Sequence, residues 1–382
     1  LPTVPPSNVG DEMSSKRLHL TADRMSLPLP TVPLPRGEVD SSAFSDEEIE
    51  TEAIRLQGAI QQHQRWPLET CRSIAPITLE INRLKKENDV FLIAHSYQTP
   101  DIIYGVADEV SDSYTLSKAA RDAPQQTILF SSVRFMAETA KIVSPHKTVI
   151  HPSPEAGCSL SDGITAQDVL DLRAQYPGIP VACYINTTAA VKAECDVSVT
   201  SSNYLRICER LPGDKLIFVP DRFMGAHLQK ALAGKKEIIV FDGECEVHAV
   251  FTGEKVRQWK QRIGEDLSIL AHPECSADVL EEADFVGSSE KLIHEAIRLG
   301  AEGQPDVMLI TECGTAERVL AETEVELNLY GACVMCRHMK ATQLEDILQS
   351  LQEPRPDQII EIDADIIARA QQNLAEMFRL AE

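Results

Sequence analysis

Three cysteines hold equivalent positions in a sequence that repeats itself three times, at a spacing of about 88 residues. Each lies 26 to 28 residues beyond an apolar run, and they are Cys158, Cys245 and Cys336. Three equivalent loops that each donate one thiolate would meet on a pseudo-threefold axis. Because thiolates are soft ligands that bind zinc or iron–sulfur clusters, the recurrence predicts one metal site shared by the three repeats.

The repeats also open on equivalent polar segments. The third residues of these openings are His95, Tyr184 and His272, which are 89 and 88 residues apart. A cluster of hydroxyl residues follows each opening, and the clusters include Ser113, Ser201 and Ser289. Each cluster lies where a predicted strand gives way to a helix, so hydroxyls and free backbone N–H groups can point at an anion. A single serine of this kind is usually only a helix cap, but the threefold recurrence favours an anion site.

The spacing of the cysteines narrows the choice of metal. A structural zinc site usually takes four ligands in paired short spacings, whereas this chain has one Cys-x-x-Cys pair, Cys333 and Cys336. An iron–sulfur cluster accepts ligands from distant loops, and three thiolates would leave one iron open as a Lewis acid. The repeat spacing fits Cys333 and Cys336 equally well. The other six cysteines are expected to be small buried residues: Cys71, Cys183, Cys195, Cys208, Cys275 and Cys313.

Composition argues against several classes of protein. A net charge of −23 over 382 residues opposes a nucleic-acid surface, which needs clustered Lys and Arg. No apolar run reaches the length of a membrane span, and we find no secretory h-region, so we expect a cytoplasmic location and no membrane contact. Ten cysteines in that compartment are expected to be reduced thiols or metal ligands rather than disulfides.

Strand-like and helix-like segments alternate within each repeat. A β-rich run, a helical run and a second β-rich run recur in this order, at 127–130, 135–143 and 148–151, at 215–219, 222–232 and 237–241, and at 306–310, 316–321 and 325–329. This alternation predicts an α/β fold of three pseudo-threefold-related αβα units, with parallel sheets in Rossmann-like layers. Ligands of such units bind beyond the carboxyl ends of the strands, so the openings and cysteine loops are expected to face one cleft.

We divide the chain into six segments on these patterns. Residues 1–45, with seven prolines in the first 35 positions, are expected to form a disordered tail. N-terminal helices are expected within 46–88, at 46–64 and 79–87, and C-terminal helices within 341–382, at 343–351 and 364–380. The three units are expected at 89–176, 177–264 and 265–340.

At these residues the sequence resembles the quinolinate synthase family, the iron–sulfur enzymes of de novo NAD biosynthesis. The resemblance runs from about residue 79 to about residue 351 and consists of motifs in the family's order. Each motif is a weak signal alone, but the set in sequence is a strong one. The motifs are Ala94-His95-Ser96-Tyr97-Gln98, Phe135-Met136-Ala137-Glu138-Thr139-Ala140-Lys141, Ala156-Gly157-Cys158-Ser159-Leu160, Thr200-Ser201-Ser202-Asn203, Cys245-Glu246-Val247-His248, Ala271-His272-Pro273-Glu274-Cys275, Ala283-Asp284-Phe285-Val286-Gly287-Ser288 and Cys336 followed by Met339-Lys340.

The resemblance implies three αβα units around a [4Fe-4S] cluster held by Cys158, Cys245 and Cys336. In the family the ligand cysteine precedes a Met-Lys pair by three residues, which selects Cys336 over Cys333. The implied reaction condenses iminoaspartate with dihydroxyacetone phosphate to quinolinate, with loss of phosphate and two waters, and the open iron acts as a Lewis acid. The implied iminoaspartate-binding residues are His95, Ser113, Tyr184, Ile185, Asn186, Ser201, His272, Pro273, Glu274 and Ser289.

The implied acid–base residues are Tyr97, His248 and Glu274. Removing water from a carbon skeleton needs a proton donor, which these side-chain types supply. His248 is also placed to ligate a metal or simply to form a hydrogen bond, and we favour a role facing the substrate. An aspartate-oxidising enzyme that hands over the unstable imine is a further hypothetical partner.

The sequence departs from the family pattern at Ser96, at Ser132 and Arg134, and after Cys336. Arg134 has a counterpart at Arg222 in the second repeat, and a surface ion pair is expected there rather than an anion contact. Other interpretations stay open: a diphthamide-forming radical enzyme, a hydroxymethylbutenyl diphosphate reductase, or an electron-transfer iron–sulfur protein without a substrate. The last would favour four cysteine ligands, with Cys333 as the fourth.

Overall fold

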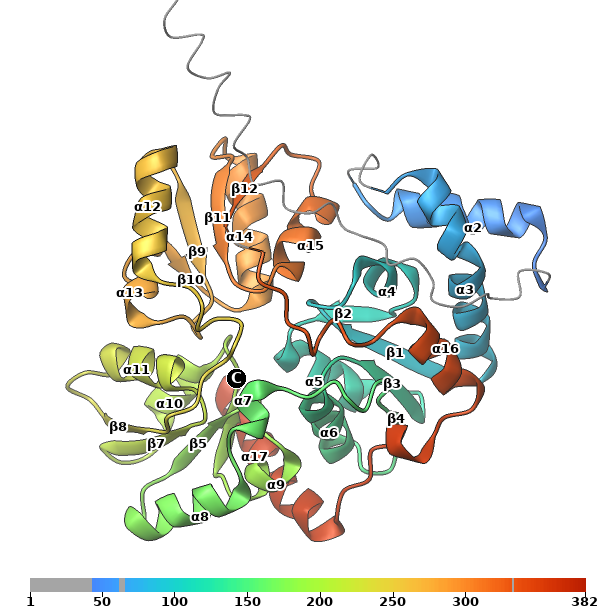
Figure 1. The fold of residues 1–382 in the computed structure, drawn as a ribbon. Coiled ribbons are helices and arrows are strands. Elements are labelled where there is room, and N and C mark those ends of the chain that lie inside the picture. Colours follow the sequence, from blue (N-terminus) through green and yellow to red (C-terminus); the bar gives the residue numbers. More distant parts are fainter. Residues whose placement is uncertain (1–42, 62–65, 332) are drawn as a thin grey trace, which may run out of the picture.

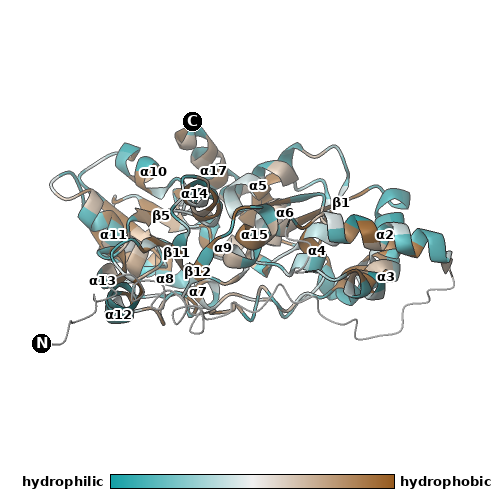
Figure 2. Ribbon diagram, turned by 90° about the horizontal axis from the view of Figure 1, so that it is seen from above, coloured by the Kyte–Doolittle hydropathy of each residue, from teal (hydrophilic) through white to brown (hydrophobic). Residues whose placement is uncertain are grey.

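A computed structural model describes residues 43–61, 66–331 and 333–382 of the chain, so nearly all of the tail expected at 1–45 lies outside the described residues. Figure 1 shows three α/β units that follow one another along the chain and surround a common centre. Figure 2, seen from above, shows that the units lie in one broad layer and that outer helices such as α12 are largely hydrophilic. Each unit contains one four-stranded parallel sheet, which confirms the predicted fold class.

The first unit is built on a sheet with strand order β2-β1-β3-β4. Its strands are β1 (Val90–His95), β2 (Glu109–Ser111), β3 (Thr127–Ser131) and β4 (Thr148–Ile150). Its helices are α4 (Pro100–Gly105), α5 (Ser113–Asp122) and α6 (Arg134–Val143). Two short helices, α7 (Ser159–Asp162) and α8 (Ala166–Gln175), lead from its cysteine loop to the second unit.

The other two units have the same strand order in their own numbering, β6-β5-β7-β8 and β10-β9-β11-β12. The second unit contains β5 (Val181–Tyr184), α9 (Ala189–Ala193), β6 (Val197–Val199), α10 (Tyr204–Arg210), β7 (Lys215–Val219), α11 (Arg222–Ala231) and β8 (Glu237–Val240). The third contains α12 (Gly253–Ile263), which packs on its sheet, and then β9 (Ser268–Ala271), α13 (Ala277–Leu280), β10 (Phe285–Val286), α14 (Ser289–Ala301), β11 (Asp306–Ile310), α15 (Gly314–Glu322) and β12 (Asn328–Tyr330).

Each sheet is covered on both faces, because successive side chains of a strand point to opposite sides. In β1, for example, Ile93 packs into one apolar cluster whereas Leu92 and Ala94 pack into another. The sheet of the third unit likewise separates two clusters. Strands buried on both faces are typical of parallel sheets, which explains the continuous apolar runs in the sequence.

The terminal helices pack on the first two units. The helices α2 (Asp46–Gly58), α3 (Leu68–Glu87) and α16 (Leu344–Gln352) cover one face of the first sheet, and a short 3-10 helix follows at Pro356–Gln358. The last helix, α17 (Ala364–Ala381), contacts α6 of the first unit and α9, β6 and α10 of the second (Figure 1). It therefore fills the junction between two units. No helix of the described residues is both long and apolar enough to cross a membrane.

Three of the predicted elements differ from the structure by more than two residues at one end. The helix predicted at 46–64 ends at Gly58, and the other two differences have a visible cause in packing. The helix predicted at 79–87 begins at Leu68, because the face formed by Cys71, Ile74 and Ile77 is buried and the helix continues through Pro76. The strand predicted at 325–329 begins only at Asn328, whose N–H donates to the carbonyl of Pro305. Packing, rather than local sequence preference, decides both boundaries.

Candidate active site

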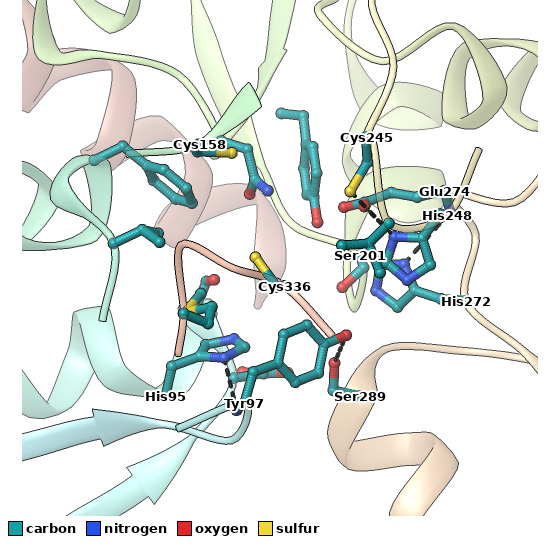
Figure 3. A pocket seen from close by; sticks show the side chains of 18 of the residues that line it. His95, Tyr97, Cys158, Ser201, Cys245, His248, His272, Glu274, Ser289 and Cys336 are labelled. Carbon is teal, nitrogen blue, oxygen red and sulfur yellow. Dashed lines mark hydrogen bonds and ion pairs between the residues drawn. The ribbon is translucent and has the colours of Figure 1, made fainter. Parts of the chain in front are cut away.

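All three units contribute side chains to one central cavity (Figure 3). The space around the lining residues, counted together with the mouth that opens to solvent, is about 680 Å³. Ile185 and Pro273 are buried but are not among the described lining residues. The predicted site residues that line the cavity are His95, Tyr97, Ser113, Cys158, Tyr184, Asn186, Ser201, Cys245, His248, His272, Glu274, Ser289 and Cys336.

The strand ends explain why residues so far apart in sequence meet. His95 and Tyr184 are the last residues of β1 and β5, and His272 directly follows β9. The strand register then pairs His95 with Ser111, Tyr184 with Val199 and Ala271 with Val286, so that each opening lies beside its hydroxyl cluster. The cysteine loops follow β4, β8 and β12, the fourth strand of each sheet. All of these segments lie at the carboxyl ends of parallel strands, where ligands of α/β folds bind.

The three predicted ligand cysteines, like Cys333, are more exposed than the six cysteines predicted to be buried. Cys158, Cys245 and Cys336 are partly exposed and line the cavity, whereas the six cysteines predicted to be buried are all buried. Burial of the sulfur atoms raises the pKa of Cys158 to about 12 and that of Cys336 to about 11. Thiols of this kind ionise only when a cation binds them. The donor set therefore fits a thiolate-bound metal centre.

Cys333 lies in a different environment from Cys336. Its side chain is hydrogen-bonded to the thiol of Cys313, and it is not among the described residues that line the cavity. The choice of Cys336 as the ligand remains a prediction, but only Cys336 of the pair lies at the cavity.

A buried carboxylate and a partly buried ammonium hold the Cys336 loop. The carboxylate of Glu312, which has 0% exposure, accepts hydrogen bonds from the N–H groups of Cys336 at 3.1 Å and Gly314 at 2.6 Å. The ammonium of Lys340 lies 3.6 Å from Glu312 and donates to the carbonyl of Tyr97 at 2.7 Å. The sequence interpretation gave Glu312 and Lys340 no role, although Lys340 belongs to a quoted motif and Glu312 follows a predicted strand.

A continuous chain of hydrogen bonds crosses the cavity wall. Nδ1 of His248 lies 2.7 Å from Oε2 of Glu274, and Nε2 of His248 lies 3.1 Å from the hydroxyl of Thr311. The same hydroxyl lies 3.0 Å from the phenol of Tyr97, which accepts a hydrogen bond from Ser289 at 2.7 Å. The three predicted acid–base residues are thus connected through Thr311, which the sequence analysis missed because its role depends on partners 63 and 214 residues away.

Burial decides the protonation of most groups in this wall. It opposes ionisation of Glu274, but the charge of His248 and the hydrogen bonds from His248 and Tyr184 outweigh it and hold the pKa of Glu274 below its usual range. Burial raises the pKa of the Tyr97 phenol and of the Tyr184 phenol well above their usual value. Both phenols are therefore neutral proton donors beside a carboxylate.

His95 and His272 are held as neutral donors of defined orientation. Burial lowers the pKa of each to about 3. Nδ1 of His95 accepts the N–H of Tyr97 at 3.1 Å, and Nδ1 of His272 accepts the N–H of Glu274 at 3.4 Å. A neutral imidazole that accepts at Nδ1 carries its proton on Nε2. Each ring thus keeps one N–H free to donate to a ligand, and His272 also stacks on His248 with ring centroids 4.7 Å apart.

Two of the three predicted serines lie at the start of a helix, as expected. Ser113 and Ser289 are the first residues of α5 and α14, where backbone N–H groups are free. Ser201 instead lies in a turn that precedes α10. Arg134 is exposed and pairs with Glu138 at 3.2 Å, so the ion pair expected there is confirmed. Its counterpart Arg222 pairs with Asp242 and Glu244.

The structure also brings a second set of donor atoms together. Ligand atoms of Cys245, His248 and Glu274 all lie within 4.8 Å of one another. A thiolate, an imidazole and a carboxylate suit a zinc-type site with an open position. Cys245 thus belongs to two candidate donor sets, the three thiols and this mixed set.

Comparison with known proteins agrees with the site. Residues 79–379 match the family model described as Quinolinate synthetase A protein. A quinolinate synthase of Caulobacter vibrioides is 39% identical over 87% of this chain and 89% of its own length. A quinolinate synthase of Sinorhizobium fredii is 39% identical over 81% of this chain and 83% of its own length. Another, from Clostridioides difficile, is 37% identical over 80% of this chain and 98% of its own length. With this identity along most of its length, the chain belongs to the quinolinate synthetase A family.

Proposed function

We propose that this protein is a quinolinate synthase of NAD biosynthesis, which condenses iminoaspartate with dihydroxyacetone phosphate and releases phosphate and two waters. The observation that carries the proposal is the single cavity in which three equivalent cysteines lie beside a connected set of acid–base groups. Family membership and the names of the relatives support it. A cytoplasmic location and a transient contact with an aspartate-oxidising enzyme remain predictions.

We infer that Cys158, Cys245 and Cys336 hold a [4Fe-4S] cluster. Their thiols line one cavity, and their buried sulfur atoms need a cation in order to ionise. When bound by three cysteines, such a cluster supplies one open iron as a Lewis acid. The alternative of an electron-transfer protein needs a fourth cysteine ligand, and the placement of Cys333 beside Cys313 gives no support for it.

The binding of iminoaspartate is assigned to donors from all three units. The free Nε2–H groups of His95 and His272 can donate to carboxylate oxygens, as can the amide of Asn186. Neutral donors suit this task because they bind an anion without a fixed countercharge that product release would have to overcome. The arrangement can hold the two carboxylates of the substrate at separate places in the cavity.

The acid–base steps are assigned to the connected wall. The neutral Tyr97 phenol can donate a proton to a departing hydroxyl group, and Thr311 can pass a proton from His248 to restore it. Glu274 stays ionised beside His248, where it orients the imidazole and stabilises the imidazolium that forms when His248 accepts a proton from the substrate. These residues thus provide a donor and an acceptor within one hydrogen-bonded set.

The test is quinolinate formation by protein purified without oxygen and supplied with fresh iminoaspartate and dihydroxyacetone phosphate. We expect product that disappears when air or a chelator removes the cluster. Iron and acid-labile sulfide are measured on the same samples. Absence of product from protein that retains its cluster would refute the proposed function.

A second candidate centre follows from the mixed donor set of Cys245, His248 and Glu274, which fits a single divalent ion. Metal analysis distinguishes this single-ion centre from the three-thiolate iron–sulfur cluster. One zinc per chain without sulfide would favour the mixed set, whereas about four irons and four sulfides would support the three-thiolate cluster.

A further inference from the structure

The loop that presents Asn186 to the cavity is a tight turn between β5 and α9. The N–H of Thr187 donates to the carbonyl of Ile185 at 2.8 Å, which closes a three-residue turn with Asn186 at its centre. Asn186 lines the cavity. Because Asn186 is the central residue, the direction of its side chain depends on the peptide groups on either side.

A buried ammonium holds the carbonyls of the two residues that flank Asn186 in the chain. Lys192, with 0% exposure, donates from Nζ to the carbonyl of Ile185 at 2.8 Å and to the carbonyl of Thr187 at a shorter distance. The same turn is held at its far end by Glu138, whose carboxylate accepts the N–H of Ala189 at 2.8 Å. A charged donor on two carbonyls is a strong restraint in a buried site.

Lys192 lies one layer behind the cavity wall. Its Nζ is 5.5 Å from the ring centroid of Phe135, and Phe135 is a lining residue. None of the described lining residues is Lys or Arg, although the proposed substrates carry two carboxylates and a phosphate. Lys340 is partly buried, and Glu312 and Glu317 lie 3.6 Å from it and balance its charge. The hydrogen-bond acceptors of Lys192 are uncharged carbonyls instead, so its hydrogen bonds restrain the backbone of the turn.

We propose that Lys192 is a positioning residue for substrate binding, which fixes Asn186 through the carbonyls of the residues on both sides of it. This inference rests on the proposed function. Burial lowers the pKa of Lys192 to about 8, against the opposing effects of Cys183 and Glu138, so the ammonium is mostly protonated at neutral pH.

A matched control lies in the same unit. Lys236 is also buried, and its Nζ donates to the carbonyls of Leu211 and Gly213, each at 2.6 Å. It is not among the described lining residues. Lys192→Met and Lys236→Met therefore remove the same kind of interaction, and a loss of stability is expected from both. Only Lys192→Met is expected to change substrate binding.

Steady-state kinetics of cluster-loaded protein test the proposal. We expect Lys192→Met to raise the KM for iminoaspartate about tenfold or more, with kcat within about threefold of wild type and unchanged cluster absorbance. Lys236→Met should keep both constants. In a double-mutant cycle with Asn186→Ala, the second substitution should add little to the first, because both act through the same side chain. A wild-type KM in Lys192→Met, or fully additive effects, would overturn the proposal.

Amide hydrogen exchange gives a readout that does not depend on activity. Lys192→Met should speed exchange in peptides that cover 185–189, whereas Lys236→Met should do so only near 211–214. If wild type makes no quinolinate, the proposed function fails, and exchange still tests the restraint on the turn. If Lys192→Met does not fold, Lys192→Arg, which keeps the charge in a different shape, takes its place. Unchanged exchange at 185–189 would contradict the positioning role.

Discussion

His248 and Glu274 form a buried pair across the boundary between the second and third units, with Nδ1 of His248 2.7 Å from Oε2 of Glu274 and side-chain exposures of 2% and 4%. Neither residue could adopt this position without the other unit. The pair is one end of the hydrogen-bonded chain that continues through Thr311 to Tyr97. Four predictions concern these hydrogen-bonded residues, the cysteine loops and a remote buried histidine.

Glu274→Gln should lower kcat by about 10²- to 10³-fold, because the amide neither stabilises a charged His248 nor holds its ring in the same orientation. Cluster content should not change. Quinolinate formation and iron content check this on anaerobic protein. The control is Glu281→Gln in the same unit, whose carboxylate is 61% exposed. A kcat within about threefold of wild type for Glu274→Gln would exclude Glu274 from the acid–base chemistry.

Tyr97→Phe should lower kcat by about 10²-fold, since it removes the proton donor and breaks the contacts with Thr311 and Ser289. The KM for iminoaspartate should change much less. Tyr330→Phe is the matched variant, because that phenol donates to Asp306 at 3.0 Å on the third sheet. Equal kinetic effects of the two substitutions would mean that Tyr97 acts only through packing.

Cys158→Ala should remove cluster and activity together, as should Cys336→Ala, whereas Cys333→Ala should preserve both. The reason is that only Cys336 of the Cys-x-x-Cys pair lines the cavity, and the thiol of Cys333 is hydrogen-bonded to the thiol of Cys313. Visible absorbance with iron and sulfide analysis measures cluster content. Loss of the cluster in Cys333→Ala, with its retention in Cys336→Ala, would reverse the ligand assignment.

The stability of the protein should fall in mild acid because of His151. This imidazole is fully buried, with Nε2 donating to the carbonyl of Ser132 at 3.0 Å, and burial lowers its pKa from 6.5 to about 4. The unfolded chain binds a proton there that the folded protein does not. The contribution is therefore fully present above pH 6.5 and is lost as pH falls toward 4, by about 3 kcal/mol at most.

Urea unfolding between pH 7 and pH 4 measures this effect. His151→Gln should flatten the slope of the free energy of unfolding against pH by about one proton. The control is His146→Gln, because His146 is exposed. Identical slopes for His151→Gln and wild type would contradict the assignment of a neutral buried His151.

Much of this fold can be predicted because its signals are local. The strands Lys215–Val219 and Asp306–Ile310 appear at the predicted residues, since parallel strands buried on both faces read as continuous apolar runs. The three cysteine loops follow from the repeat, and the structure places all three at one cavity. The start of α3 at Leu68 was missed because a helix through Pro76 depends on the surface that it covers.

The amino-acid sequence by itself determined the α/β units, the equivalence of the cysteines and the residue types that reach the cavity. These properties depend on side-chain periodicity and on repetition along the chain, and both can be recognised from the order of the residues alone. The tertiary structure alone decided that Thr311 joins His248 to Tyr97, that Glu312 holds the Cys336 loop and that Lys192 holds the turn at Asn186. Such contacts depend on how separate strands and units pack, and a buried polar group takes whichever partner that packing brings within hydrogen-bonding distance.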